Sequence, residues 1–98
     1  MHYDAPAFEK RIRKPPEAAG LLRKFREQLA SAEPFDAVDL EKLMQEFVQS
    51  EGVTIGQMIH PLRVAVTGKT VGFGLFETLA ILGKGRCLAR IDGALARV

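Results

Sequence analysis

A glycine-rich segment between residues 68 and 74 is the part of this 98-residue sequence whose residue types could bind a ligand. It runs Gly-Lys-Thr-Val-Gly-Phe-Gly, and glycines let a backbone approach a ligand closely and expose N–H groups to it. Phe73 lies between two of these glycines, with Arg63 and Lys69 nearby in sequence. An aromatic ring beside cations suits an unpaired nucleotide, because the ring stacks on the base and the cations bind phosphates or base edges. The pattern equally allows Phe73 to fold back and fill the core.

Two phosphate-binding motifs that this segment resembles at first are incomplete. Gly68-Lys69-Thr70 matches the end of a P-loop, but that motif needs a glycine where Arg63 stands, and a strand before it. Gly72 and Gly74 begin a dinucleotide fingerprint whose third glycine would fall at Glu77. We therefore expect no nucleotide cofactor, and the sequence predicts no other cofactor.

Residues typical of catalytic and metal sites are few and scattered. The two histidines, His2 and His60, lie far from Cys87, the single cysteine, whereas a structural zinc site needs about four ligands. We expect His60 to be a partly buried helical residue and Cys87 a small core residue. Asp36 and Asp39 are expected to cap a helix rather than to act as a carboxylate pair. Because no nucleophile, base and oxyanion site come together, the chain is not expected to be an enzyme on its own.

Composition and charge describe a small globular domain with an uneven charge distribution. Hydrophobic residues make up 47%, and the net charge is only +2. Residues 1–52 carry 8 basic and 10 acidic side chains, whereas residues 53–98 carry 6 basic and 2 acidic ones. The second half therefore indicates either a face that meets an anion or a solvated basic surface. Binding through so few cations would depend steeply on salt.

Targeting and membrane signals are not found. No apolar run approaches the about 20 residues that cross a bilayer, and the N-terminus lacks the layout of a secretory signal. We expect one cytoplasmic domain over residues 1–98 without a membrane partner, in which residues 1–15 are a candidate linking segment.

The glycine-rich segment must be held in place by helices, which the spacing of apolar residues predicts. The pattern predicts short helices over about 6–13 and from Pro16 to about residue 31, the second carrying an apolar stripe at intervals of three and four. A third helix is expected between a cap at Asp36 and Gly52. A fourth is expected from about Thr54 to Gly68, with Pro61 kinking or dividing it.

Two further helices follow the glycine-rich segment. They are predicted over residues 75–82, ending at Gly83, and over about 84–96, where the side chains offered to the core are Cys87, Leu88, Ile91 and Leu95. Six short helices without a strand predict an all-α bundle that is held together by packing of the apolar stripes.

Two blocks of sequence flank the same segment and are far more specific than a lone glycine motif. Pro-Leu-Arg-Val-Ala-Val-Thr-Gly spans residues 61–68, and Gly-Leu-Phe-Glu-Thr-Leu-Ala-Ile-Leu-Gly spans residues 74–83. Together they closely resemble the C-terminal, anticodon-binding end of bacterial-type glutamyl-tRNA synthetases, and the resemblance extends over about residues 8–95. It implies a compact α-helical cage that recognises the anticodon of tRNA(Glu).

The resemblance also implies which residues contact the tRNA. Carried over by position, Arg63, Gly72, Phe73 and Leu75 would contact anticodon bases. Some relatives have Thr-Pro or Ser-Pro where this chain has Gly-Phe, which removes a hydroxyl and replaces a rigid proline with an aromatic ring. Phe73 would then supply a stacking contact, or the readout of that base would be lost.

Further cations are expected to attract the tRNA backbone independently of sequence. These are Lys69, Lys84, Arg86 and Arg90.

The catalytic signatures of the same enzymes, His-x-Gly-His and Lys-Met-Ser-Lys-Ser, do not occur in this chain. If the chain is a fragment, its parent is an ATP-dependent glutamate–tRNA ligase, with the catalytic domain as a partner in cis or in trans. The alternative is a stand-alone helical paralogue that acts as a protein-interaction module without tRNA recognition.

Overall fold

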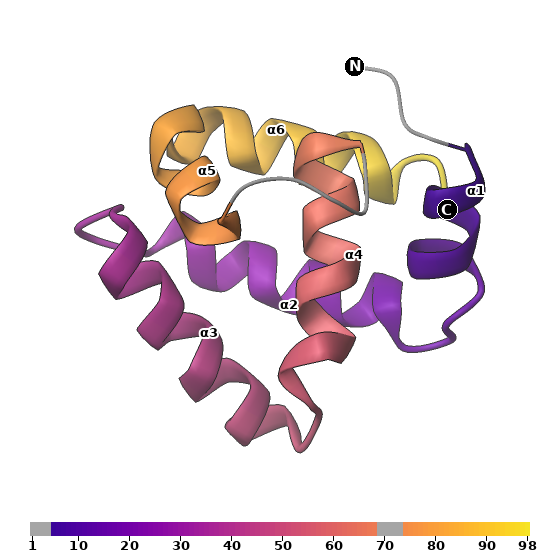
Figure 1. Ribbon diagram of the computed structural model, residues 1–98, viewed down its shortest axis with the longest axis horizontal. Coiled ribbons are helices and arrows are strands. Elements are labelled where there is room, and N and C mark those ends of the chain that lie inside the picture. Colours follow the sequence, from indigo (N-terminus) through magenta and orange to yellow (C-terminus); the bar gives the residue numbers. More distant parts are fainter. Residues whose placement is uncertain (1–4, 69–73) are drawn as a thin grey trace.

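The computed structural model describes residues 5–68 and 74–98, and these ranges contain helices and turns but no strand. Figure 1 shows the elements, which are α1 (Ala5–Phe8), the π-helical turn η1 (Glu9–Arg13), α2 (Ala18–Ala30), α3 (Ala37–Glu51), α4 (Ile55–Thr67), α5 (Leu75–Leu82) and α6 (Lys84–Leu95). The predicted all-α fold of six short helices is confirmed.

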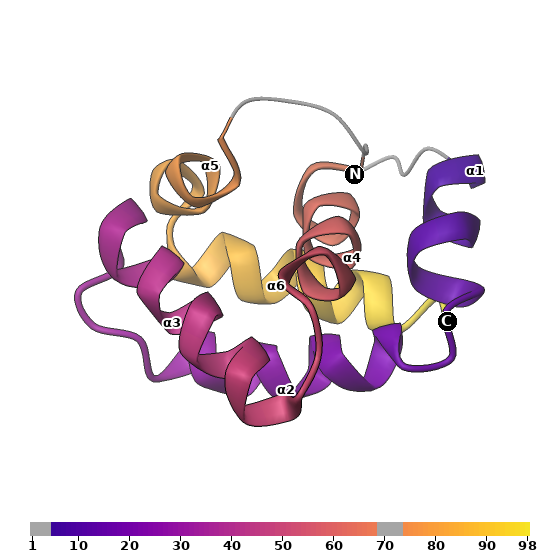
Figure 2. The ribbon, with the colours of Figure 1, turned by 60° about the horizontal axis from the view of Figure 1, so that its bottom comes forward.

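Helices α2 and α6 run antiparallel, side by side, and α4 crosses them (Figures 1 and 2). Helices α3 and α5 pack at one end of this layer, and α1 with η1 packs at the other end, next to the C-terminus. Arg26 of α2 holds Asp92 of α6 through two hydrogen bonds of 3.0 and 3.1 Å, from Nε and Nη2. This forked contact links the two helices at their solvent-facing edge.

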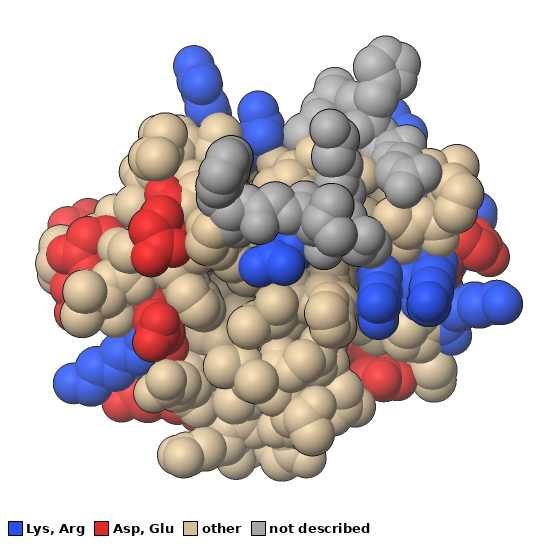
Figure 3. Space-filling model, in the orientation of Figure 1, with Lys and Arg blue, Asp and Glu red and all other residues tan. Residues whose placement is uncertain are grey.

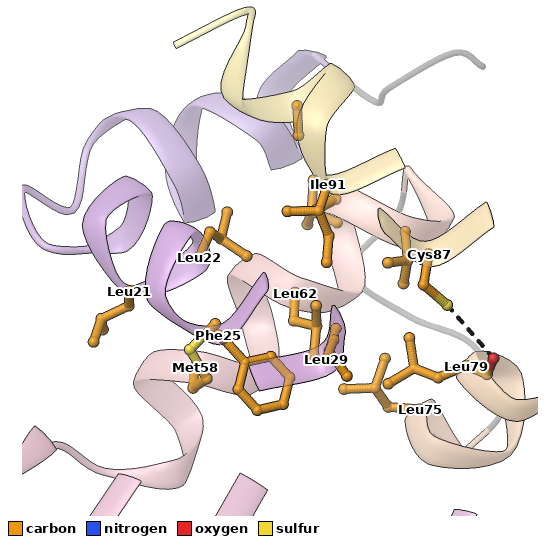
Figure 4. Packing of buried hydrophobic residues seen from close by; sticks show 14 of the residues in the cluster. Leu21, Leu22, Phe25, Leu29, Met58, Leu62, Leu75, Leu79, Cys87 and Ile91 are labelled. Carbon is orange, nitrogen blue, oxygen red and sulfur yellow. Dashed lines mark hydrogen bonds between the residues drawn. The ribbon is translucent and has the colours of Figure 1, made fainter. Parts of the chain in front are cut away.

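The core lies where the apolar stripes of the central helices meet (Figure 4). The predicted stripe of α2 is confirmed, since all of its members are buried: Ala18, Leu21, Leu22, Phe25 and Leu29. The ring of Phe25 meets that of Phe47 edge to face, with centroids 5.1 Å apart. Ile55 is the first residue of α4, and 41% of it is exposed.

Helix ends follow the predicted capping residues. The Asp36 side chain accepts a hydrogen bond of 2.9 Å from the Asp39 backbone N–H at the start of α3. Gly52 and Gly68 close α3 and α4 with φ of 69° and 81°, a left-handed conformation that glycine adopts without a steric cost. Thr54 caps α4 in a reciprocal capping box with Gln57.

Two local predictions need correction. Residues 9–13 form a π-helical turn rather than a continuation of the first α-helix, and the Lys14 N–H donates to the Glu9 carbonyl five residues back, at 2.8 Å. Helix α4 continues through Pro61 and is not divided there. Buried side chains on both sides of the proline, Met58 and Leu62, anchor the two halves in one core.

In the described part of the chain, no helix combines the length and the apolar character that crossing a membrane requires.

The residues before Pro15 include Ala7, Phe8 and Ile12, all buried in the common core.

Candidate nucleic-acid interface

Arg63 lies near the end of α4, five residues before the capping Gly68. Its side chain is half-buried, and its guanidinium forms no hydrogen bond or ion pair with the residues that the structure describes. The Arg63 carbonyl accepts a hydrogen bond of 2.6 Å from the Thr67 hydroxyl, which holds the last turn of the helix. A guanidinium has five N–H donors in a planar fork, so this arrangement leaves a donor group available for a base edge or a phosphate.

The glycine-rich segment leaves α4 at Gly68 and joins α5 at Gly74. Three of the predicted tRNA contacts in it, Lys69, Gly72 and Phe73, lie outside the described residues. Leu75 is described, and only 3% of it is exposed, because it packs into the core at the first position of α5. A contact from this position to a base would therefore involve its backbone.

The remaining predicted phosphate contacts lie on α6 and differ in their surroundings. Arg86 is exposed. Arg90 is half-buried, and its Nη1 donates to the Val66 carbonyl at 2.7 Å, which ties α6 to the last turn of α4. The Lys84 ammonium forms an ion pair of 3.3 Å with Glu33 in the α2–α3 connection. The structure thus brings Arg90 close to the helix that carries Arg63, and it directs Lys84 to another connection.

Charged side chains of both signs are spread over the face shown in Figure 3. Several blue side chains lie together on the side of α1 and η1 with red ones beside them, and most of the red side chains lie toward α3 and α5, where blue ones also occur. A groove of about 470 Å³ between α2 and α3 is lined by three carboxylates, those of Glu27, Glu46 and Glu51. Because these repel phosphates, the groove does not suit an RNA backbone.

A further candidate site lies between η1 and α4, and the sequence did not predict it. In the part of the chain that the structure describes, Arg11 Nε and His60 Nδ1 are both buried without a hydrogen-bond partner. Burial, then the positive charges of Arg11 and Arg63, lower the pKa of His60 below its usual value. The sequence offered only a basic run before Pro15, without any sign that it would face α4.

Other candidates for chemistry have structural roles. Cys87 is fully buried, as predicted, and its Sγ donates to the Leu79 carbonyl at 3.5 Å (Figure 4). Burial raises the pKa of this thiol to about 11, so it stays protonated near neutral pH and is a poor nucleophile. The hydrogen bond with Asp36, followed by desolvation, raises the pKa of Asp39.

The lowered pKa of His60 predicts a pH-dependent stability. Because the unfolded chain binds a proton at His60 more readily than the folded chain, His60 contributes its full stabilisation of the fold above about pH 6.5. This contribution is lost as the pH falls through the pKa of His60 in the folded chain. Urea unfolding at pH 5 and pH 7 should therefore show a larger loss for the wild type than for His60→Gln. An equal loss in both proteins would contradict this prediction.

Comparison with known proteins gives a consistent result. The family profile described as the anticodon binding domain matches residues 1–95. The chain is 43% identical over 89 residues to a glutamate–tRNA ligase of Moorella thermoacetica, covering 88% of this chain and 18% of that protein. It is also 43% identical over 93 residues to the corresponding Thermus thermophilus ligase, covering 95% of this chain and 20% of that protein.

Among solved structures, a crystal structure of a glutamate tRNA ligase from Elizabethkingia meningosepticum, in complex with its amino acid, matches with a TM-score of 0.89 and 24% identity. The match covers 98% of this chain and 18% of that one, and it supports the fold. The chain thus spans about a fifth of the length of the curated relatives that it matches.

Proposed function

The chain belongs to the anticodon binding domain family, and from this premise we propose that it is a tRNA-binding module that recognises the anticodon of tRNA(Glu). Its matched relatives are glutamate–tRNA ligases, and it aligns with about a fifth of their length. Charging of a tRNA would then require a catalytic domain, in cis or in trans. In this role the module works in the cytoplasm and needs no cofactor.

The observation that carries the proposal is the Arg63 guanidinium, which has no hydrogen-bond or ion-pair partner among the residues that the structure describes. It lies on the last turns of α4, directly before the segment that joins α4 to α5. Splayed anticodon bases would dock against residues 68–75, where Phe73 supplies a stacking surface and Arg63 donates to a base edge or phosphate. Gly72 and the backbone of Leu75 would contribute the close approach. Lys69, Arg86 and Arg90 would add attraction to the backbone, as would Lys84 after release from Glu33.

The test is a titration of the chain with a tRNA(Glu) transcript at about 50 mM salt. Arg63→Ala should weaken binding by about 1–3 kcal/mol, the usual value of one directed base contact. A transcript with an exchanged anticodon should bind the wild type more weakly. The wild type and Arg63→Ala should bind that transcript with the same affinity.

The matched control is Arg23→Ala, which removes the same charge from an exposed position of α2. It should lower affinity slightly and equally for all transcripts, because only non-specific attraction is lost. If Arg63→Ala binds within about twofold of the wild type, Arg63 does not contact the anticodon. If the wild type fails to bind tRNA at this salt, the module does not recognise tRNA, which favours a protein-interaction role.

A further inference from the structure

A small cleft opens between η1 and the first half of α4. Its volume is about 90 Å³, and it is lined by Lys10, Arg11, Pro15, Glu17, Gly56, Gln57, His60 and Pro61. The cleft has room for a group of phosphate size but not for a peptide segment. Its position beside α4 places it one helical turn from Arg63, on the helix already assigned to the RNA interface.

Two residues that line the cleft carry buried polar atoms. Arg11 Nε and His60 Nδ1 are both buried, and neither has a hydrogen-bond partner within residues 5–68 and 74–98. Buried polar atoms are almost always paired, so each exception calls for an explanation such as an absent ligand. Arg11 and His60, which carry these atoms on different elements, η1 and α4, both line the same cleft.

The electrostatics of the cleft favour an anion. Arg11 and Arg63 both act on His60 with positive charge, and Lys10 lines the same cleft. Glu17 is the carboxylate among the lining residues, and its Oε1 already accepts a hydrogen bond of 3.4 Å from the Gln57 amide. Lys10 and Arg11 outnumber Glu17 among the lining residues, so the net positive charge of the cleft would attract an anion.

The local backbone adds an independent indication. Arg11 lies within the π-helical turn, and such turns occur disproportionately at functional sites. The turn carries Lys10 and Arg11 next to each other, and both line the cleft. The sequence therefore places two neighbouring donors at this edge of the cleft.

We propose that Arg11 and His60 form a phosphate site in which they bind one backbone phosphate of an RNA whose neighbouring nucleotides contact Arg63. This inference rests on the proposed tRNA binding for the source of the phosphate, whereas the site itself rests on the cleft. The Arg11 guanidinium would donate to the phosphate, and the His60 ring would donate when it is protonated. The contact fixes the position of the RNA backbone but does not select a base.

The first experiment identifies the source of the phosphate. Binding of the tRNA(Glu) transcript is measured between about 50 and 200 mM salt for wild type, Arg11→Gln and Arg13→Gln. Arg11→Gln should reduce the slope of log K against log[salt] by about 1 and should weaken transcripts with native and exchanged anticodons by the same factor. Arg13→Gln is the matched control, because Arg13 lies on the same turn, outside the cleft, and pairs with Glu9 at 3.5 Å.

The second experiment tests the site without RNA. Inorganic phosphate is titrated into the free chain while the ring nitrogens of His60 are followed by NMR. Phosphate should raise the apparent pKa of His60, because an anion beside Arg11, Lys10, Glu17 and Arg63 stabilises the imidazolium. This response should disappear in Arg11→Gln and persist in Arg13→Gln.

The outcomes separate the two proposals. If phosphate shifts His60 but tRNA does not bind, the anion site stands and the tRNA proposal fails. If tRNA binds, but Arg11→Gln changes neither the slope of log K against log[salt] nor the phosphate-induced shift of the His60 pKa, the phosphate site is wrong while tRNA binding stands. Equal slope changes in Arg11→Gln and Arg13→Gln would also overturn the site, because they would show diffuse attraction. Thermal melting should show that Arg11→Gln and Arg13→Gln are folded. His60→Gln supplies a further variant, and it should also lose the part of the tRNA affinity that the phosphate contact provides.

Discussion

Phe25→Ala is expected to lower the free energy of unfolding by about 3–5 kcal/mol. The side chain of Phe25 is fully buried on α2 and meets the ring of Phe47 edge to face, so alanine would leave a cavity that the crossing helices cannot close. A domain of this size has about 5–15 kcal/mol of stability in total. The loss should therefore appear as a fall in Tm of more than about 10 °C in a thermal melt followed by circular dichroism.

The control for this prediction is Ile81→Ala on α5. Ile81 is 86% exposed, so removal of its methylene groups should change the free energy of unfolding by less than about 0.5 kcal/mol. Equal effects of Phe25→Ala and Ile81→Ala would mean that the ring of Phe25 does not lie in the core.

Leu62→Ala is expected to cost about 2–5 kcal/mol of stability while leaving the tRNA affinity of the folded chain unchanged. Leu62 is fully buried in α4, and its neighbour Arg63 is half-buried with its guanidinium unpaired among the described residues. Adjacent residues of one helix thus face the core and the proposed RNA interface. Urea unfolding measures the loss of stability. Titration with tRNA at low temperature, where the wild type and Leu62→Ala both remain folded, measures the affinity separately.

Arg63→Ala should show the opposite result, with a loss of tRNA affinity and a change in stability below about 0.5 kcal/mol. This reciprocal pair distinguishes an interface residue from a structural one. If both variants lose stability and affinity together, α4 acts as a structural support, and the guanidinium has no contact of its own with RNA.

Local features of the fold were predictable because their causes are local. The apolar stripe from Ala18 to Leu29, the Asp36 cap and the closing glycines each depend on residues within about two helical turns. The two blocks on either side of residues 69–73 likewise identified the family directly. Of the two effects predicted for Pro61, division of the helix does not occur, and buried residues on both sides of it belong to one continuous α4.

The candidate site was predictable only in part. Arg63 followed from the Pro-Leu-Arg block, and the structure leaves its guanidinium without a partner among the described residues. The resemblance could not show that packing buries the side chain of Leu75. It also could not show that the Arg90 guanidinium donates to the last turn of α4.

By itself, the sequence determined which segments are helical, which face of each is apolar and to which family the chain belongs, because periodicity, caps and motifs are properties of neighbouring residues. Only the tertiary structure decided that Arg11 and His60 share a cleft and that Arg11 Nε and His60 Nδ1 are buried without a partner among the described residues. The distance between two side chains on different helices depends on how the whole core packs, and no short stretch of sequence contains that information.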